Sequence, residues 1–177
     1  MELTEILKPF FRDVLNFPKE GIVFKDITPL LANPSARSSV VRAIASHFVN
    51  QEIEAVAAVE ARGFIFGALI ANELNVPFIP VRKAGKLPYK KRIEEYSLEY
   101  GTAIIEMHED AITNGQRVLI HDDLLATGGT ATAAGNLVRK TGGIVSGYSF
   151  VVNLSFLPGE HLLKERFGLQ PHYLVKF

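Results

Sequence analysis

Apolar segments of strand length alternate with segments of helical pattern along most of the chain, and this alternation restricts the possible folds more than any other feature. Runs that favour buried strands cover residues 55–59, 77–81, 117–120 and 144–154. Helical patterns lie between them at residues 64–74 and 130–140. Continuous apolar strands separated by helices are typical of parallel sheets covered on both faces. The chain is therefore predicted to be an α/β protein with a doubly wound, mostly parallel sheet flanked by helices.

The N-terminal part carries two further helical patterns. An amphipathic helix, kinked or starting late at Pro9, is predicted from the apolar residues Leu3, Ile6, Leu7, Phe10, Phe11 and Val14. A second helix is predicted to follow Asn33, an N-cap residue, with Pro34 at its first position. No repeat, low-complexity tract or linker divides the chain, so residues 1–177 are interpreted as a single domain.

Composition excludes several classes of protein. The chain has 177 residues and no cysteine, which removes disulfide scaffolds, thiolate metal sites and a cysteine nucleophile. Its 19 basic and 19 acidic residues give a net charge of zero, which argues against a general nucleic-acid binder. No apolar run approaches the ~18 residues that span a bilayer, and the N-terminal residues MELTEILKPFF lack a signal-peptide pattern. A cytoplasmic protein without a membrane or nucleic-acid partner is expected.

The segment VLIHDDLLATGGT, residues 118–130, is the strongest functional signal. Asp122 and Asp123 follow an apolar strand, and a glycine-containing turn then opens the predicted helix. Free N–H groups and the positive end of a helix dipole suit a phosphate, and the hydroxyls of Thr127 and Thr130 add donors. Carboxylates accept hydrogen bonds from sugar hydroxyls, so a ribose 5-phosphate group would satisfy both halves of the segment. The alternative is an ordinary capped helix preceded by solvated aspartates.

A second strand end is followed by a cation and a glycine, in the segment VEARGFIFG at residues 59–67. This arrangement suits a second anionic group, because an arginine can form a bidentate pair with a phosphate. Arg62 is the candidate. The alternative is a surface arginine that pairs with Glu60.

The segment RKAGKLPYKKRIEEYSLEY, residues 82–100, begins with a basic stretch. Six of the 19 basic residues lie within 82–92, with no acid among them. Gly85 and Pro88 break any helix, so the segment is interpreted as a long loop, and long loops in compact domains often act as lids. A solvated flexible loop is one alternative. Nucleic-acid binding is another, with aromatic residues limited to Tyr89 and Tyr96.

These motifs together resemble those of the type I phosphoribosyltransferases. DDLLATGGT is similar to the phosphoribosyl-pyrophosphate signature of that family, and in its extended form to that of the adenine phosphoribosyltransferases. VEARGFIFG resembles the pyrophosphate loop, RKAGKLP…YSLEYG the flexible catalytic loop at 82–100, and GIVFKDITP at 21–29 the hood over the purine. The resemblance covers the chain from about Phe17 to about Leu154. It implies the type I phosphoribosyltransferase fold, with an N-terminal helix and small hood within residues 1–33.

The resemblance also implies site residues. Contacts with phosphoribosyl pyrophosphate are expected from Arg62, Lys83, Lys86, Tyr100, Asp122, Asp123, Ala126, Thr127, Gly128, Gly129 and Thr130. The pyrophosphate loop would comprise Glu60, Ala61, Arg62 and Gly63, with a cis peptide between Glu60 and Ala61, and the adenine contacts would be Val23, Phe24 and Lys25. Glu99, Asp122 and Asp123 would be catalytic, with Glu99 near the purine as a proton acceptor or hydrogen-bond partner.

Two residues depart from the family pattern. His121 stands where the family usually has an apolar residue, which leaves open a role as an acceptor near the ribose. Lys25 stands where many members have arginine, which puts a planar stacking contact in doubt.

The implied activity is purine salvage, in which adenine and phosphoribosyl pyrophosphate give AMP and pyrophosphate. Mg²⁺ would be held mainly by substrate oxygens and water; the remaining histidines show no metal-ligand spacing, namely His47, His108, His161 and His172. A homodimer is also implied. Two alternatives remain: transfer to another purine such as xanthine, guanine or hypoxanthine, and a non-catalytic ligand-sensing regulator on the same fold.

Overall fold

The protein is described by a computed structural model that covers residues 2–97 and 101–177. The N-terminal part contains α1 (Leu3–Leu7), the 3₁₀ turn η1 (Lys8–Phe10), β1 (Arg12–Leu15), β2 (Val23–Asp26), α2 (Thr28–Ala32) and α3 (Pro34–Phe48). The middle of the chain contains β3 (Ala55–Val59), α4 (Arg62–Leu74), β4 (Phe78–Lys83), β5 (Lys91–Ser97) and β6 (Thr102–His108). The remaining elements are β7 (Arg117–Leu125), α5 (Gly129–Lys140), β8 (Ile144–Asn153), α6 (Gly159–Phe167) and β9 (His172–Lys176).

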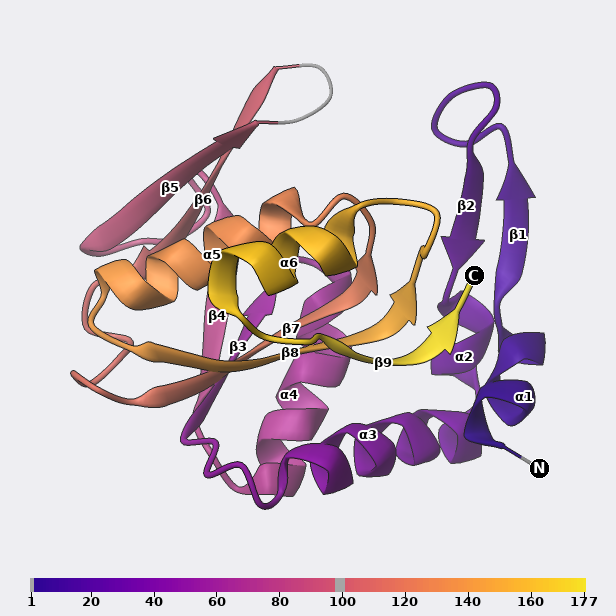
Figure 1. The fold of residues 1–177 in the computed structure, drawn as a ribbon, viewed down its shortest axis with the longest axis horizontal. Coiled ribbons are helices and arrows are strands. Elements are labelled where there is room, and N and C mark those ends of the chain that lie inside the picture. Colours follow the sequence, from indigo (N-terminus) through magenta and orange to yellow (C-terminus); the bar gives the residue numbers. More distant parts are fainter. Residues whose placement is uncertain (1, 98–100) are drawn as a thin grey trace.

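A seven-stranded sheet with the order β5-β6-β4-β3-β7-β8-β9 forms the centre of the molecule (Figure 1). The five strands from β4 to β9 pair in parallel, while β6 and β5 extend the edge in antiparallel pairing. The chain goes from β3 to β4 on one side and later to β7 on the other, so the strand order reverses between β3 and β7. This is a doubly wound sheet, as predicted, with its switch point at β3 and β7.

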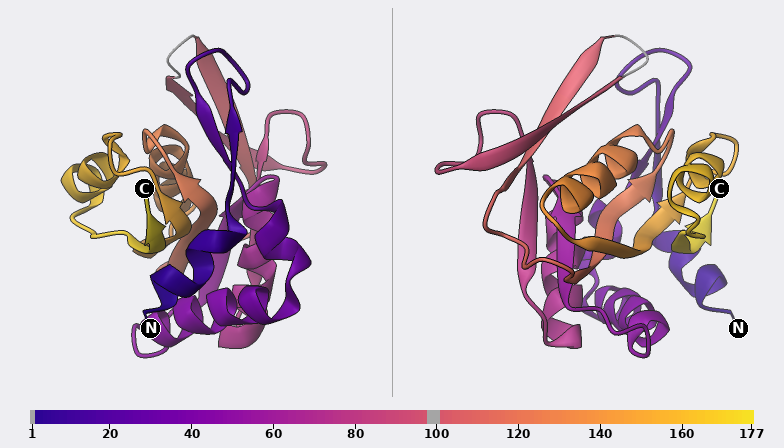
Figure 2. Two further views of the ribbon diagram at one scale, coloured as in Figure 1. Left: turned by 90° about the vertical axis from the view of Figure 1, so that its right-hand side faces the viewer. Right: turned by 60° about the vertical axis from the view of Figure 1, so that its left-hand side comes forward.

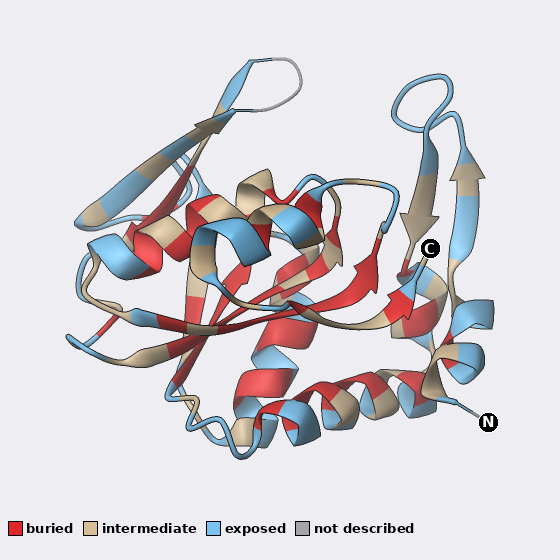
Figure 3. Ribbon diagram, viewed as in Figure 1, coloured by how far each residue is buried: buried red, intermediate tan, exposed pale blue. Residues whose placement is uncertain are grey.

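Separate hydrophobic cores lie on the two faces of the sheet. One contains the inner side chains of α5 and α6, and the other contains those of α1 to α4. Buried residues follow the central strands and the inner sides of the helices (Figure 3). All five residues of β3 are buried, because this strand has neighbours on both edges and helices on both faces.

The N-terminal helix is shorter than predicted. Helical structure ends at Phe10, and the chain continues as strand β1, so Val14 belongs to a strand and not to a helix. Pro9 lies in the 3₁₀ turn, where its fixed φ angle is tolerated. The predicted cap of the next helix is confirmed, since the Asn33 side chain accepts a hydrogen bond from the Ala36 N–H at 2.9 Å.

Strands β1 and β2 form a separate antiparallel hairpin within the predicted hood segment. Figures 1 and 2 show this hairpin and the β5–β6 hairpin projecting on the same side of the molecule, at opposite ends of the sheet. The sequence did not predict the second hairpin. Residues 91–97 pair with 102–108 along their whole length, so the segment 82–100 is not a loop throughout. Only a short turn separates β4 from β5, and residues 84–90 are named the 84–90 turn below.

In the described part of the chain, every helix is too short or too polar to cross a lipid bilayer.

Candidate active site

The predicted motifs converge at the carboxyl ends of β3 and β7, which is where ligands bind in doubly wound sheets. Residues 60–63 leave β3 and enter α4, and the 126–128 segment leaves β7 and enters α5. Asp122 and Asp123 lie within β7, whose pairing with β8 continues to Leu125. The prediction that the strand ends before the two acids was therefore wrong. The longer strand holds both acids within the pairing of β7 with β8, whereas the pairing of β7 with β3 ends at His121.

A cavity of about 390 Å³ lies at this junction and is lined by side chains from separate segments. Its lining comprises Val59, Glu60, Lys83, Tyr96, Ala103, Ile105, Asp122 and Thr130. A smaller hollow of about 70 Å³ adjoins Asp122 along the 124–131 segment. Another hollow, of about 310 Å³, lies between α3 and α4 and contains none of the predicted site residues. Four of the predicted site residues therefore line the first of these cavities, namely Glu60, Lys83, Asp122 and Thr130.

The two neighbouring carboxylates are electrostatically strained. Asp123 is only 3% exposed, and its N–H donates a hydrogen bond of 2.9 Å to Oδ1 of Asp122. Burial raises the pKa of Asp122 well above its usual 3.8, and the charge of Asp123 raises it further. Burial also raises the pKa of Asp123, while the Arg62 guanidinium opposes this rise. Donors from a ligand, such as sugar hydroxyls, would relieve this strain.

Arg62 is held against the acidic pair and the hood. Its Nε lies 3.0 Å from Oδ2 of Asp123, and its guanidinium carbon lies 4.8 Å from the centre of the Phe24 ring. The alternative in which Arg62 pairs with Glu60 is wrong, because Arg82 takes that position with Nε 2.7 Å from Oε2 of Glu60. The peptide bond between Glu60 and Ala61 is cis, as the resemblance implied.

The segment 126–130, named the phosphate-type loop below, is a tight turn that packs against α6. Gly128 has a positive φ of 83°, a conformation that favours glycine. Gly159 donates its N–H to the Ala126 carbonyl at 3.1 Å, and a Cβ added at Gly159 would lie 2.3 Å from that oxygen. The sequence did not identify Gly159, whose only local signal is the Pro158-Gly159 pair before a helix.

Tyr96 is a second residue that the sequence did not place at the site. The Thr130 hydroxyl donates a hydrogen bond of 3.2 Å to the Tyr96 hydroxyl, which ties the start of α5 to the β5–β6 hairpin. Tyr96 also lines the 390 Å³ cavity. Tyr96 lies three residues after Ile93 on an otherwise charged strand, so the two apolar side chains show no period-two alternation that could have signalled it.

The basic stretch is partly neutralised by acids that are distant in sequence. Arg82 pairs with Glu60, Lys91 with Glu106, and Lys90 lies 3.9 Å from Glu109. Lys83 and Lys86 are exposed, and neither has a carboxylate partner among the described residues. These are the two lysines that the resemblance assigns to the substrate. Glu99 and Tyr100, which it also assigns, lie outside the described residues.

The hood residues face two different ways. Phe24 points toward Arg62, whereas the Lys25 ammonium lies 2.7 Å from Oδ1 of Asp13 and 4.0 Å from the centre of the Phe177 ring. Phe24 and Lys25 are adjacent on β2, and their side chains point to opposite faces of the hairpin. Val23 is exposed.

His121 lies on the far side of β7 from the cavity. It is fully buried, its Nδ1 is hydrogen-bonded to the Ser149 hydroxyl at 2.9 Å, and its ring faces Gly67 of α4. A role near the ribose is not supported by this position. Burial lowers the pKa of His121 to about 3, although the bond to Ser149 favours the charged form.

A loss of stability in acid is expected from His121. The unfolded chain protonates this ring near pH 6.5 and the folded protein only near pH 3, so stability falls as the pH drops below about 6.5. When the pH is lowered from about 7.5 to about 5, the free energy of unfolding should fall by roughly 2 kcal/mol less in His121→Leu than in the parent. Urea unfolding at both pH values measures this difference. The control His161→Leu, at an exposed position, should match the parent, and equal losses in all three proteins would contradict the assignment.

No cluster of three or more histidine, aspartate or glutamate side chains that could cage a metal occurs within residues 2–97 and 101–177. His47 and His172 stack on each other with ring centres 3.8 Å apart, and His108 Nε2 is hydrogen-bonded to the Pro88 carbonyl. Among the described residues, the carboxylate oxygens at or beside the cavity that could bind a metal ion belong to Glu60, Asp122 and Asp123.

An open, mostly parallel sheet with an acidic pair and a glycine-containing turn at its switch point is the arrangement expected of an enzyme that binds a sugar phosphate. The comparisons with known proteins point to one family of such enzymes. Residues 27–146 match the family described as "Phosphoribosyl transferase domain". Adenine phosphoribosyltransferase of Sorangium cellulosum is 56% identical over 162 residues, which cover 92% of this chain and 81% of that protein.

Solved structures give the same result. A crystal structure of adenine phosphoribosyltransferase from Thermoanaerobacter pseudethanolicus superposes with a TM-score of 0.94 at 46% identity, covering 98% of this chain and 99% of that one. The Saccharomyces cerevisiae enzyme, complexed with an imino-altritol bisphosphate and adenine, has a TM-score of 0.88 at 38% identity and 96% coverage of both chains. The chain belongs to the adenine phosphoribosyltransferase family.

Proposed function

We propose that this chain transfers the 5-phosphoribosyl group of phosphoribosyl pyrophosphate to adenine, giving AMP and pyrophosphate in purine salvage. The observation that carries the proposal is the cavity at the switch point, where Asp122, Thr130 and Lys83 line one space of about 390 Å³. The acidic pair, the phosphate-type loop and a lysine with no carboxylate partner in the described part of the chain match the hydroxyls, the 5-phosphate and the diphosphate of a single substrate. Family membership supports the same reaction.

Each part of the substrate has proposed partners. Asp122 and Asp123 accept hydrogen bonds from the ribose hydroxyls, and the 5-phosphate binds the loop comprising Ala126, Thr127, Gly128, Gly129 and Thr130. The diphosphate binds the loop of Glu60, Ala61, Arg62 and Gly63, together with Lys83, Lys86 and Tyr100. Binding would require Arg62 to share its charge between Asp123 and the incoming diphosphate, because the two already form an ion pair.

The transfer would break the bond between the anomeric carbon and the diphosphate oxygen and form a bond from that carbon to a ring nitrogen of adenine, with pyrophosphate leaving. It would pass through an oxocarbenium-like state, as in glycoside hydrolysis. The carboxylates beside the sugar stabilise its positive charge, and the cations stabilise the leaving diphosphate. Glu99 is proposed to accept or share the proton of the purine nitrogen. Segment 82–100 is proposed to cover the site and exclude water.

Mg²⁺ is proposed as the cofactor. The cavity fits an ion that arrives with the substrate, because Asp122 supplies carboxylate oxygens there, with Asp123 beside it, and the described residues form no protein cage. When bound, the ion would neutralise charge on the diphosphate.

The purine is proposed to bind beneath the β1–β2 hairpin, with the Phe24 ring stacked on it and backbone groups of Val23 and Lys25 reading its edge. Phe24 supports this position because its ring faces Arg62, which in turn pairs with Asp123.

A cytoplasmic homodimer is further proposed, and light scattering measures its mass.

A steady-state assay with adenine, hypoxanthine, guanine and xanthine, each with phosphoribosyl pyrophosphate and Mg²⁺, tests the function. Formation of AMP in large excess over the other products is expected. If a different purine is turned over and no AMP forms, that purine is the substrate and adenine is not. Absence of any turnover, combined with DNA binding at physiological salt, would favour the regulator.

Phe24→Ala should raise the KM for adenine by about tenfold and the KM for phosphoribosyl pyrophosphate by less than about twofold, because a ring stacked on a base contributes about 1–3 kcal/mol. Leu15→Ala is the matched control. Leu15 is an exposed residue of the same hairpin, and its register partner Val23 places it on the opposite face from Phe24. Equal effects of the two substitutions on adenine would contradict the stacking contact.

A further inference from the structure

Glu106 is a buried carboxylate outside the residues assigned to the reaction so far. It lies on β6, is 1% exposed, and is the register partner of Arg82 on β4. A buried charge is unfavourable unless it is paired and hydrogen-bonded. The surroundings of Glu106 meet that requirement with donors from one short segment, the 84–90 turn, and from the strand that follows it.

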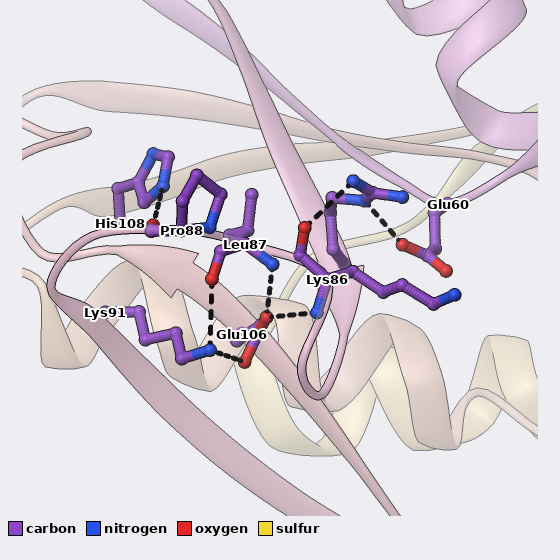
Figure 4. Close-up of polar contacts among 8 residues, drawn as sticks. Glu60, Lys86, Leu87, Pro88, Lys91, Glu106 and His108 are labelled. Carbon is purple, nitrogen blue, oxygen red and sulfur yellow. Dashed lines mark hydrogen bonds and ion pairs between the residues drawn. The ribbon is translucent and has the colours of Figure 1, made fainter.

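Figure 4 shows how Glu106 reaches this segment. Its Oε1 accepts hydrogen bonds from the N–H groups of Lys86 and Leu87 at 2.9 and 2.7 Å. Its Oε2 lies 2.8 Å from the ammonium of Lys91, which also donates to the Leu87 carbonyl at 3.1 Å. Although burial opposes ionisation, these donors lower the pKa of Glu106 to about 2, so the carboxylate is charged at neutral pH.

The other side of the turn is tied to the pyrophosphate loop. Arg82 donates from its guanidinium to the Lys86 carbonyl at 3.0 Å and to Oε2 of Glu60 at 2.7 Å. The backbone of Lys86 is therefore held at its N–H by Glu106 and at its carbonyl by Arg82. The turn carries one of the two unpaired lysines of the basic stretch and directly follows the other, Lys83, which lines the cavity.

We propose that Glu106 is a positioning residue, which fixes the 84–90 turn so that Lys83 and Lys86 are placed for the diphosphate of the substrate. The proposal rests on the proposed function. Glu106 is not among the residues that line the cavity, and its side chain contacts the backbone of the turn and Lys91. Its removal is expected to affect the diphosphate selectively, because the acidic pair and the phosphate-type loop belong to other elements.

Calorimetric titration with phosphoribosyl pyrophosphate and with AMP tests this proposal. The two ligands share the ribose 5-phosphate, and only the first carries a diphosphate. Glu106→Gln keeps the shape of the side chain, removes its charge and leaves Lys91 unpaired. The dissociation constant for phosphoribosyl pyrophosphate should rise about tenfold and that for AMP by less than about twofold.

Glu94→Gln is the matched control. Glu94 lies in the same hairpin and also pairs with a lysine, Lys140, while accepting a hydrogen bond from Asn136 at 2.8 Å. It does not contact the 84–90 turn. This variant should lower thermal stability without changing the ratio of the two dissociation constants.

If Glu106→Gln does not fold, the double variant Glu106→Leu with Lys91→Leu replaces the buried pair by apolar side chains, which proteins often tolerate. It should show the same selective loss. Equal weakening of both ligands, or no weakening of either, would overturn the positioning role. A parent protein that binds neither ligand would instead overturn the proposed function, and the role of Glu106 with it.

Discussion

Turnover falls by about a thousandfold or more in the double variant Asp122→Asn with Asp123→Asn, because the charge that stabilises a cationic sugar is removed. The fold should survive, since asparagine has nearly the same shape and both positions lie within the paired strand β7. Steady-state assay with adenine and circular dichroism measure the two effects. Near-normal turnover would contradict the assignment of the acids to the ribose. The control Asp110→Asn, at an exposed position, should retain parental turnover.

The same double variant should be more stable than the parent at neutral pH. Folding raises the pKa of both carboxyls, so the folded protein binds protons more tightly than the unfolded chain above about pH 4. The free energy of unfolding that Asp122 and Asp123 contribute therefore falls as the pH rises from their usual pKa toward their pKa values in the folded protein. Asparagine carries no such penalty, and an increase in melting temperature would accompany the loss of turnover.

The second large effect is expected from Gly159→Ala. A methyl group at this position would lie 2.3 Å from the Ala126 carbonyl oxygen and 2.8 Å from a Leu125 methyl group, so the loop or α6 must move. Overpacking of this kind costs about 1–3 kcal/mol of stability, and displacement of a positioned loop by about 1 Å can cost about a hundredfold in rate. We expect kcat/KM for phosphoribosyl pyrophosphate to fall by roughly that factor.

Gly147→Ala provides the control for overpacking. A Cβ there would lie 2.5 Å from the Phe48 ring, in the core between β8 and α3 and away from the loop. This variant should lose similar stability and keep its kcat/KM. If both variants lose stability and neither loses kcat/KM, the contact between Gly159 and Ala126 has no part in placing the phosphate loop.

The parallel core could be predicted because its strands are buried on both faces. Such strands are uniformly apolar, as in AVAAV at 55–59, and helices must separate them. The antiparallel edge formed by β5 and β6 could not be predicted from the sequence. The strand at 91–97 has only Ile93 and Tyr96 as apolar side chains, and Ile93 is half exposed, so its pattern resembles that of a charged loop.

The candidate site was predictable where residue types alone define the chemistry, as in the acids and glycines of 122–130. Which partner a charged residue selects was not predictable. Arg62 begins α4 and Arg82 lies on β4, and only the folded geometry assigns Glu60 to Arg82 and Asp123 to Arg62. The packing of Gly159 on Ala126 likewise joins segments that are unrelated in sequence pattern.

The pairing of β3 with β7 has a consequence for the order of folding. Ala55 is aligned with Val118, and α4, β4, β5 and β6 all lie between them along the chain. Closing so long a segment costs entropy before its contacts form, which makes such pairings slow. The residues proposed to bind the diphosphate and those proposed to bind the ribose therefore come together only when this central pairing is complete. A bound substrate would therefore stabilise the fully folded protein and not the partly folded states in which β3 and β7 are still unpaired.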